Sequence, residues 1–192
     1  MTILYKDISN LIPFEVNDLI NVDSIQIIDE SPCEQFVHKQ NLHATVLNPE
    51  FLIFLKSKNI EIEKVTIWHW FCTAARWAHI DCSTTGEILP AALNWTLEEH
   101  SSQVNFYDLP NVDKTVRFGN EVDTGWRTDN VTAYIPVNVE GLTPNAVWSN
   151  RGPVLINTSV PHLIIAPEMR RSVTLGIRPP VPIEVLLERL QS

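Results

Sequence analysis

The sequence has no long apolar segment. No run of about eighteen consecutive apolar residues occurs in it, which is roughly the length that a membrane-spanning helix needs. The first residues also lack a basic segment followed by an apolar stretch, which is the pattern of a secretory signal peptide. We therefore expect a soluble, cytoplasmic protein without a membrane partner.

Cysteine and positive charge are both scarce. The three cysteines, Cys33, Cys72 and Cys82, show no Cys-x-x-Cys spacing, which argues against a disulfide framework and against a structural zinc site. We expect them to be reduced. Only 14 lysines and arginines oppose 23 acidic residues, and the net charge of −9 makes nucleic acid an unlikely partner. A small-molecule or peptide substrate is favoured, and the oligomeric state stays open.

The residues that are abundant favour β-structure. The chain has 13 prolines, six tryptophans and many β-branched residues, but few stretches with helical periodicity. Its 192 residues are enough for one domain with a sizeable core. We divide this single domain, residues 1–192, into an N-terminal extension with a helix (1–59), a β-rich core (60–178) and a C-terminal helix (179–192).

Apolar runs and turn signals predict the elements of the core. We expect strands at 60–72, 76–82, 89–97, 103–107, 131–137 and 169–177, and a strand, a turn and a further strand over 152–162. Asn48 followed by Pro49 predicts the start of a helix. The long polar connection 109–131 is predicted to act as a lid or substrate loop.

One short segment carries the first candidate site. In an extended segment 76–82, Trp77, His79 and Asp81 share one face because side chains alternate with a period of two. An imidazole and a carboxylate on one face supply two thirds of a two-histidine, one-carboxylate site for non-haem iron(II). His162, at the start of a later strand, is placed to supply the second imidazole.

An arginine follows this histidine on the last expected strand. Arg170, Ser172 and Thr174 share one face of that strand, whereas Arg171 shares the other face with apolar residues. The order is therefore His-x-Asp, a long gap, His, and then Arg-x-Ser. This order resembles the iron(II)/2-oxoglutarate-dependent oxygenases, and the resemblance covers roughly residues 65–178.

The resemblance implies both a fold and a site. Members of that family fold as a double-stranded β-helix, a cupin-like jelly roll, here with a few flanking helices. His79, Asp81 and His162 match the family's iron(II) ligands, and Arg170 matches the arginine that holds the distal carboxylate of 2-oxoglutarate, with Ser172 beside it. The implied activity is that of a dioxygenase that hydroxylates a small molecule, an amino acid or a peptide.

Two further residues are candidates for binding 2-oxoglutarate. Asn94 is flanked by apolar residues in its strand, so it must find a partner in the core or face the site, and family members often carry a similar Leu-Asn there. Tyr107 ends the strand 103–107, where its hydroxyl group is able to point inward.

Several alternatives remain open from the sequence. If the apolar side of the last strand faces the lumen, Arg171 binds the cosubstrate instead of Arg170. Four of the six tryptophans are expected in the core, whereas Trp126 and Trp148 lie in polar segments and are candidates for substrate contact. The main alternative function is a non-catalytic jelly-roll module with a binding or structural role. A cupin with another metal is less favoured because its His-x-His motif is absent.

Overall fold

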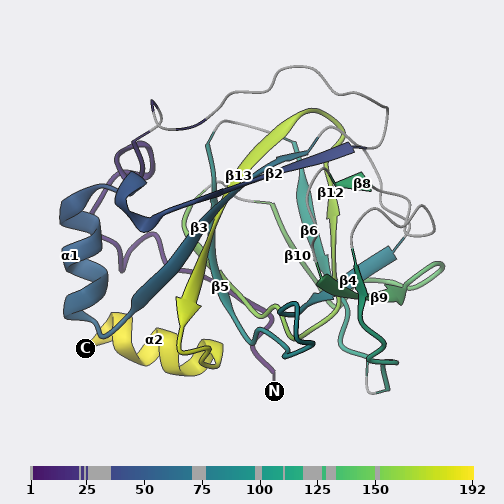
Figure 1. The fold of residues 1–192 in the computed structure, drawn as a ribbon. Helices are drawn as coiled ribbons and strands as arrows, with labels where there is room; N and C mark the ends of the chain where they lie inside the picture. The colour runs from purple at the N-terminus through teal and green to yellow at the C-terminus, as the bar shows by residue number, and fades with distance from the viewer. Residues whose placement is uncertain are drawn as a thin grey trace.

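The chain folds into a mostly β structure of two sheets and two α-helices, as seen in a computed structural model (Figure 1). The structure describes residues 2–21, 23, 25, 36–70, 77–97, 101–109, 111–118, 127–128, 133–149 and 152–192. The expectation of a mostly β fold is confirmed. No helix within these described residues is long and apolar enough to cross a membrane.

The larger sheet has seven strands in the order β1-β11-β5-β13-β3-β2-β8. Their bounds are β1 Tyr5–Asp7, β2 Phe36–Leu42, β3 Glu61–Trp70, β5 Ala92–Thr96, β8 Arg127–Thr128, β11 Val154–Ile156 and β13 Arg170–Arg178. All neighbours are antiparallel except the short parallel pair β2 and β8. Because β1 and β2 belong to this sheet, the segment 1–59 supplies strands to the core as well as a helix.

The smaller sheet has six antiparallel strands in the order β10-β6-β12-β4-β9-β7. Their bounds are β4 Trp77–Asp81, β6 Gln103–Phe106, β7 Arg117–Phe118, β9 Ala133–Asn138, β10 Ala146–Trp148 and β12 His162–Ile165. The predicted strand, turn and strand over 152–162 are β11, the following turn and β12. The predicted loop 109–131 contains the short strands β7 and β8, and much of the rest of it lies outside the described residues.

The two helices cover the outer face of the larger sheet. Helix α1 spans Pro49–Ser57, and the Asn48 side chain caps it by accepting a hydrogen bond of 2.8 Å from the Glu50 backbone N–H. Helix α2 spans Ile183–Gln191. Short 3-10 helices lie at 16–18 and 44–46. Both α-helices are where the sequence predicts them.

The pleat of the larger sheet separates an apolar face from a polar one. On β3, Val65 and Ile67 pack in the main core against both helices, whereas Thr66 and Trp68 line a cavity on the other side. The strands β5 and β13 alternate in the same way, since Val173 belongs to the core. The inner face of the larger sheet is therefore the wall of the candidate site.

Candidate metal centre

The three predicted ligands come together on two neighbouring strands of the smaller sheet. His79 and Asp81 lie on β4, and His162 opens β12, where its Cα is the antiparallel partner of the His79 Cα. The end of β4 is fixed by its backbone, because the Asp81 N–H donates to the Thr158 carbonyl at 3.0 Å. Strand pairing thus brings residues 79 and 162 side by side.

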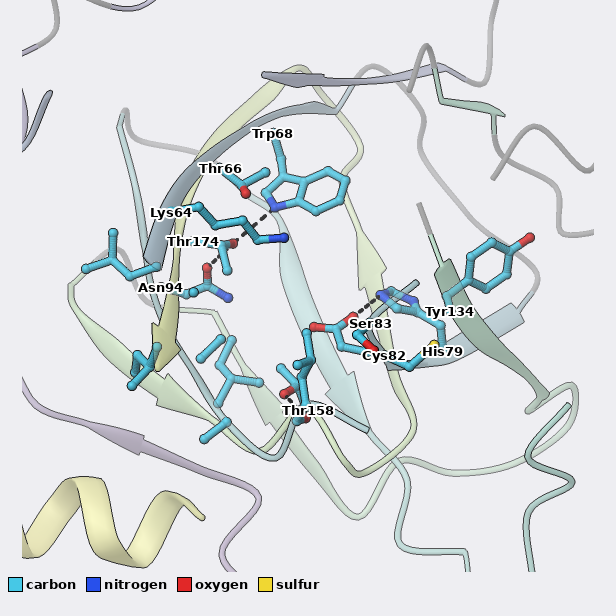
Figure 2. Close-up of a pocket in the computed structure, with 18 of the residues that line it drawn as sticks. Lys64, Thr66, Trp68, His79, Cys82, Ser83, Asn94, Tyr134, Thr158 and Thr174 are labelled. Carbon is cyan, nitrogen blue, oxygen red and sulfur yellow. Dashed lines mark hydrogen bonds and ion pairs between the residues drawn. The ribbon is translucent and has the colours of Figure 1, made fainter. Parts of the chain in front are cut away.

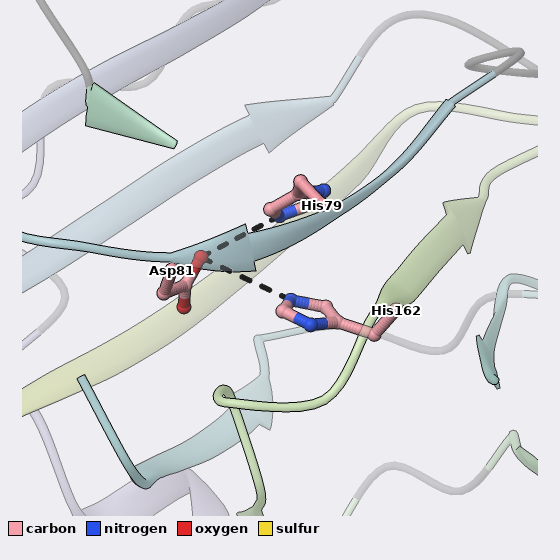
Figure 3. A group of neighbouring side chains, drawn as sticks. All are labelled: His79, Asp81 and His162. Atoms are coloured by element: carbon pink, nitrogen blue, oxygen red, sulfur yellow. Dashed lines mark ion pairs between the residues drawn. The ribbon is translucent and has the colours of Figure 1, made fainter. Parts of the chain in front are cut away.

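The ligand atoms of these residues converge (Figure 3). The distance from His79 Nε2 to Asp81 Oδ1 is 3.6 Å, and that from His162 Nε2 to the same oxygen is 4.0 Å. One ligand atom from each of the three residues lies within 4.8 Å of the other two. Among the residues that the structure describes, this is the group of three or more potential metal ligands. Both distances exceed a normal hydrogen bond, so the three groups are close without being bonded to each other.

The orientation of His162 suits metal binding. Its Nδ1 lies 3.1 Å from the Val160 carbonyl oxygen, which accepts a hydrogen bond from a protonated Nδ1. That bond leaves the lone pair on Nε2, the nitrogen that points towards Asp81. A carbonyl that fixes the tautomer and ring orientation of a histidine in this way is typical of metal ligands.

Burial also sets the protonation of the site. It lowers the pKa of His79 well below its usual value, and the neighbouring His162 adds to this effect, so the His79 imidazole is neutral at pH 7. Burial raises the pKa of Asp81, while His162, Lys39 and Lys64 act in the opposite direction. A neutral imidazole is the form that binds a metal ion.

A thiol lies near the triad but outside the cluster of ligand atoms. Cys82 is a buried free cysteine that lines the same cavity. Burial and the charge of Asp81 both raise its pKa, so the thiol stays protonated at neutral pH. Cys33 and Cys72 lie outside the described residues.

The triad forms part of the wall of a cavity of about 470 Å³ that both sheets line. Figure 2 shows Lys64, Thr66 and Trp68 of β3 across the cavity from His79 and Tyr134. A cavity of this volume is in the usual range for small-molecule sites. A molecule inside it would lie between the ligand triad and the polar face of the larger sheet.

The arginine expected on the cavity side is found there. Arg170 is buried, with 2% of its surface exposed, and lines the cavity together with Ser172. Arg171 is only half-buried and is not among the described lining residues. Arg170 therefore lies on the cavity side of β13, and its role towards a cosubstrate stays a prediction.

Asn94 belongs to a polar chain across three strands of the larger sheet. The Trp68 indole N–H donates to the Thr174 hydroxyl at 3.1 Å, and that hydroxyl donates to the Asn94 side-chain oxygen (Figure 2). With its oxygen engaged, Asn94 retains its amide NH₂ group as a donor on the cavity wall. Its polar character inside an apolar strand is therefore explained by the cavity.

Two predicted contact residues lie elsewhere. Tyr107 packs in the apolar cluster of the smaller sheet and is not among the described residues that line the cavity. The reason is parity: Val104 of β6 faces the cavity, so a residue three places later faces the other side. Trp148, a suggested substrate contact, is 4% exposed in an apolar cluster with Phe106. Trp126 lies outside the described residues.

Sequence reasoning missed several lining residues. Lys39 and Lys64 line the cavity from β2 and β3, and Tyr134 of β9 lies at its edge beside His79. Lys39 also lies 5.4 Å from the centre of the Trp68 ring. The alternation of polar and apolar residues at the start of β3 was a signal for Lys64, but β2 and β9 carry no comparable local pattern.

No protein-family model matches the chain, and no curated protein matches its sequence. The functional argument therefore depends on the geometry of the site.

Proposed function

We propose that the protein is an iron(II)- and 2-oxoglutarate-dependent oxygenase that acts on a small molecule, an amino acid or a peptide. The observation that carries this proposal is the convergence of two imidazole nitrogens and one carboxylate oxygen, all within 4.8 Å, on the wall of a cavity. Three protein ligands on one side of an ion leave its remaining positions open to small molecules.

The donor set fits iron(II). Two neutral nitrogens and one carboxylate are the ligands that such non-haem sites use, whereas structural zinc sites are closed by four ligands rich in cysteine. Cys82 is the only thiol that lines the cavity among the described residues, and its sulfur does not belong to the cluster of ligand atoms. His79, Asp81 and His162 would hold the ion through Nε2, Oδ1 and Nε2.

The strand order supports a double-stranded β-helix. Along the chain, β3, β5, β11 and β13 lie in the larger sheet, and β4, β6, β10 and β12 lie in the smaller one. These eight strands form the sets β11-β5-β13-β3 and β10-β6-β12-β4, between which the cavity lies. We infer that they are the jelly-roll scaffold of the oxygenase family, with β1, β2, β7, β8 and β9 as additions.

Arg170 would anchor the cosubstrate. Its guanidinium group, buried beside Ser172, is suited to bind the distal carboxylate of 2-oxoglutarate through two parallel hydrogen bonds. The Asn94 amide would donate a further hydrogen bond from the same wall. When bound, iron(II) would supply oxygen activation coupled to decarboxylation of 2-oxoglutarate, while the cavity orients the substrate and limits access of water.

The test has two stages. Purified, chelator-treated protein is first titrated with manganese(II) and then with 2-oxoglutarate, and its iron(II) form is afterwards incubated aerobically with ascorbate and labelled 2-oxoglutarate. We expect one metal ion per chain, metal-dependent binding of 2-oxoglutarate, and release of labelled succinate.

The matched variants are His162→Gln, which removes a ligand, and His43→Gln, which alters an exposed histidine outside the cavity. Only the first is expected to abolish metal binding and succinate release. Metal binding without any binding of 2-oxoglutarate, or no metal binding at all, would favour the alternative of a non-catalytic module.

A further inference from the structure

Two of the basic side chains that line the cavity, Arg170 and Lys64, lie at well-separated levels of the larger sheet. Arg170 pairs in register with Trp70, whereas Gly176 pairs with Lys64. Six residues separate positions 170 and 176 along β13, which corresponds to roughly 20 Å at about 3.3 Å per residue. Even long side chains at these two levels are too far apart to bind the same carboxylate group. A carboxylate group held by Arg170 would therefore leave Lys64 available to another ligand.

The backbone makes room for Lys64 at this level. A Cβ atom at Gly176 would lie 3.0 Å from Lys64 Cγ and 3.4 Å from Lys64 Cε, so any larger residue there would push the lysine side chain aside. The register of β13 and β3 also shifts between Gly176 and Ile177. Bulges of this kind commonly redirect a side chain near a functional site. Figure 2 shows the Lys64 amino group pointing into the cavity.

Lys64 forms no ion pair with any acid among the described residues, although its charge acts on the Asp81 carboxyl group across the cavity. Arg178, which also lines the cavity, is paired with Glu63 at 2.9 Å. Within the described residues, by contrast, no hydrogen bond or ion pair forms at the Lys64 ammonium group. Lys39 adds a second positive charge beside Trp68. Basic side chains that face a cavity in a protein with a net charge of −9 favour an anionic ligand there.

We propose that Lys64 binds a carboxylate group of the primary substrate, so that the substrate is a small anionic molecule whose apolar part packs against Trp68. This inference rests on the proposed function, because it assigns Arg170 to the cosubstrate and leaves the Lys64 level to the substrate. It narrows the substrate class from any small molecule or peptide to small carboxylates.

The test uses benzoate, phenylacetate and hexanoate as probes, each beside its neutral primary amide. Each probe is titrated calorimetrically into the protein loaded with manganese(II) and 2-oxoglutarate. We expect at least one carboxylate to bind about tenfold or more tightly than its amide, which is the usual scale of a charge-assisted hydrogen bond. Lys64→Met should abolish this preference. Lys56→Met, an exposed lysine on α1, should retain it.

Gly176→Val provides a second variant that changes no charge. The added side chain should displace Lys64 and weaken binding of the carboxylates. If the positive charge alone attracted the carboxylates, whatever the position of Lys64, their binding would not change. Circular dichroism and the melting temperature report whether each variant is folded. Lys64→Arg keeps the positive charge and should therefore retain most of the preference for carboxylates over amides that Lys64→Met loses.

The outcomes separate this inference from the proposed function. Equal binding of carboxylates and amides, or no binding of any probe, overturns the substrate assignment. A loss of 2-oxoglutarate affinity in Lys64→Met also overturns it, because Lys64 would then serve the cosubstrate. If manganese(II) and 2-oxoglutarate fail to bind, the oxygenase proposal fails, and the same titration of the metal-free protein still decides whether Lys64 binds carboxylates.

Discussion

Metal binding should stabilise the fold through the triad, and His162 is the residue at which to test this. The exposed fraction of His162 is 5%, and its ring centre lies 4.3 Å from that of His79, so alanine would leave a cavity. Glutamine fills more of that volume but removes the imidazole ligand. The informative quantity is therefore the metal-induced change in melting temperature, not the absolute stability.

The expected change follows from linkage. Metal at a concentration one hundred times its dissociation constant adds about 2.7 kcal/mol to the free energy of unfolding. For a chain of this size, about 1 kcal/mol raises the melting temperature by roughly 2–4 °C, so the wild-type shift should be about 5–11 °C. If His162→Gln weakens binding about a hundredfold, the same metal concentration adds only about 0.4 kcal/mol, or roughly 1–2 °C.

The assay is differential scanning fluorimetry of chelator-treated protein with and without manganese(II). His43→Gln serves as the control, since His43 is exposed and accepts a hydrogen bond from the Thr45 backbone N–H at 3.3 Å. That variant should keep the full metal-induced shift even if its own melting temperature falls. An equal shift in wild type and His162→Gln would refute the assignment of His162 as a ligand.

Three further predictions concern the other site residues. Because burial raises the pKa of Asp81, Asp81→Asn should raise the melting temperature of the metal-free protein while abolishing its metal-induced shift; a lower melting temperature would contradict this. The lowered pKa of His79 means that the unfolded chain binds more protons, so metal-free stability should fall as the pH drops below about 6.5. Denaturant titrations at pH 7.5 and 5.5 measure this fall in the free energy of unfolding, and it should be smaller in His79→Gln than in the wild type. An equal fall in both proteins would count against the burial argument. Arg170→Met should weaken 2-oxoglutarate binding at least about tenfold with metal binding retained, whereas Arg171→Met should change neither, as calorimetry would show.

The sequence predicted those parts of the site that depend on local alternation. His79 and Asp81 were expected on one face of a strand, and both line the cavity, while Ala78 and Ile80 pack on the other side. The same period of two separated Arg170 from Arg171. These predictions succeeded because the pleat of a strand is a local property of the backbone.

Long-range pairing could not be predicted in the same way. That His162 lies opposite His79 is decided by the pairing of β12 with β4, across more than eighty residues of sequence. The order of the motifs suggested that the two histidines meet, but only through a family resemblance. Likewise, nothing local in β2 places Lys39 next to Trp68, because the pairing of β2 with β3 decides it.

The errors have a common physical cause. Tyr107 was a candidate because its hydroxyl group could point inward from its strand, and Trp148 was a candidate for substrate contact because it lies in a polar segment. In the structure, β10 pairs with β6, and Trp148 is the register partner of Val104, which places it in an apolar cluster. Burial of large aromatic side chains in a core outweighs the polarity of their sequence neighbours.

The most direct test of the metal site is an anomalous X-ray measurement at the iron edge on crystals grown with iron(II) without oxygen. The account predicts one strong peak within about 2.5 Å of His79 Nε2, His162 Nε2 and an Asp81 carboxylate oxygen. A peak at another place, or no peak near these three atoms at saturating iron(II), would contradict it.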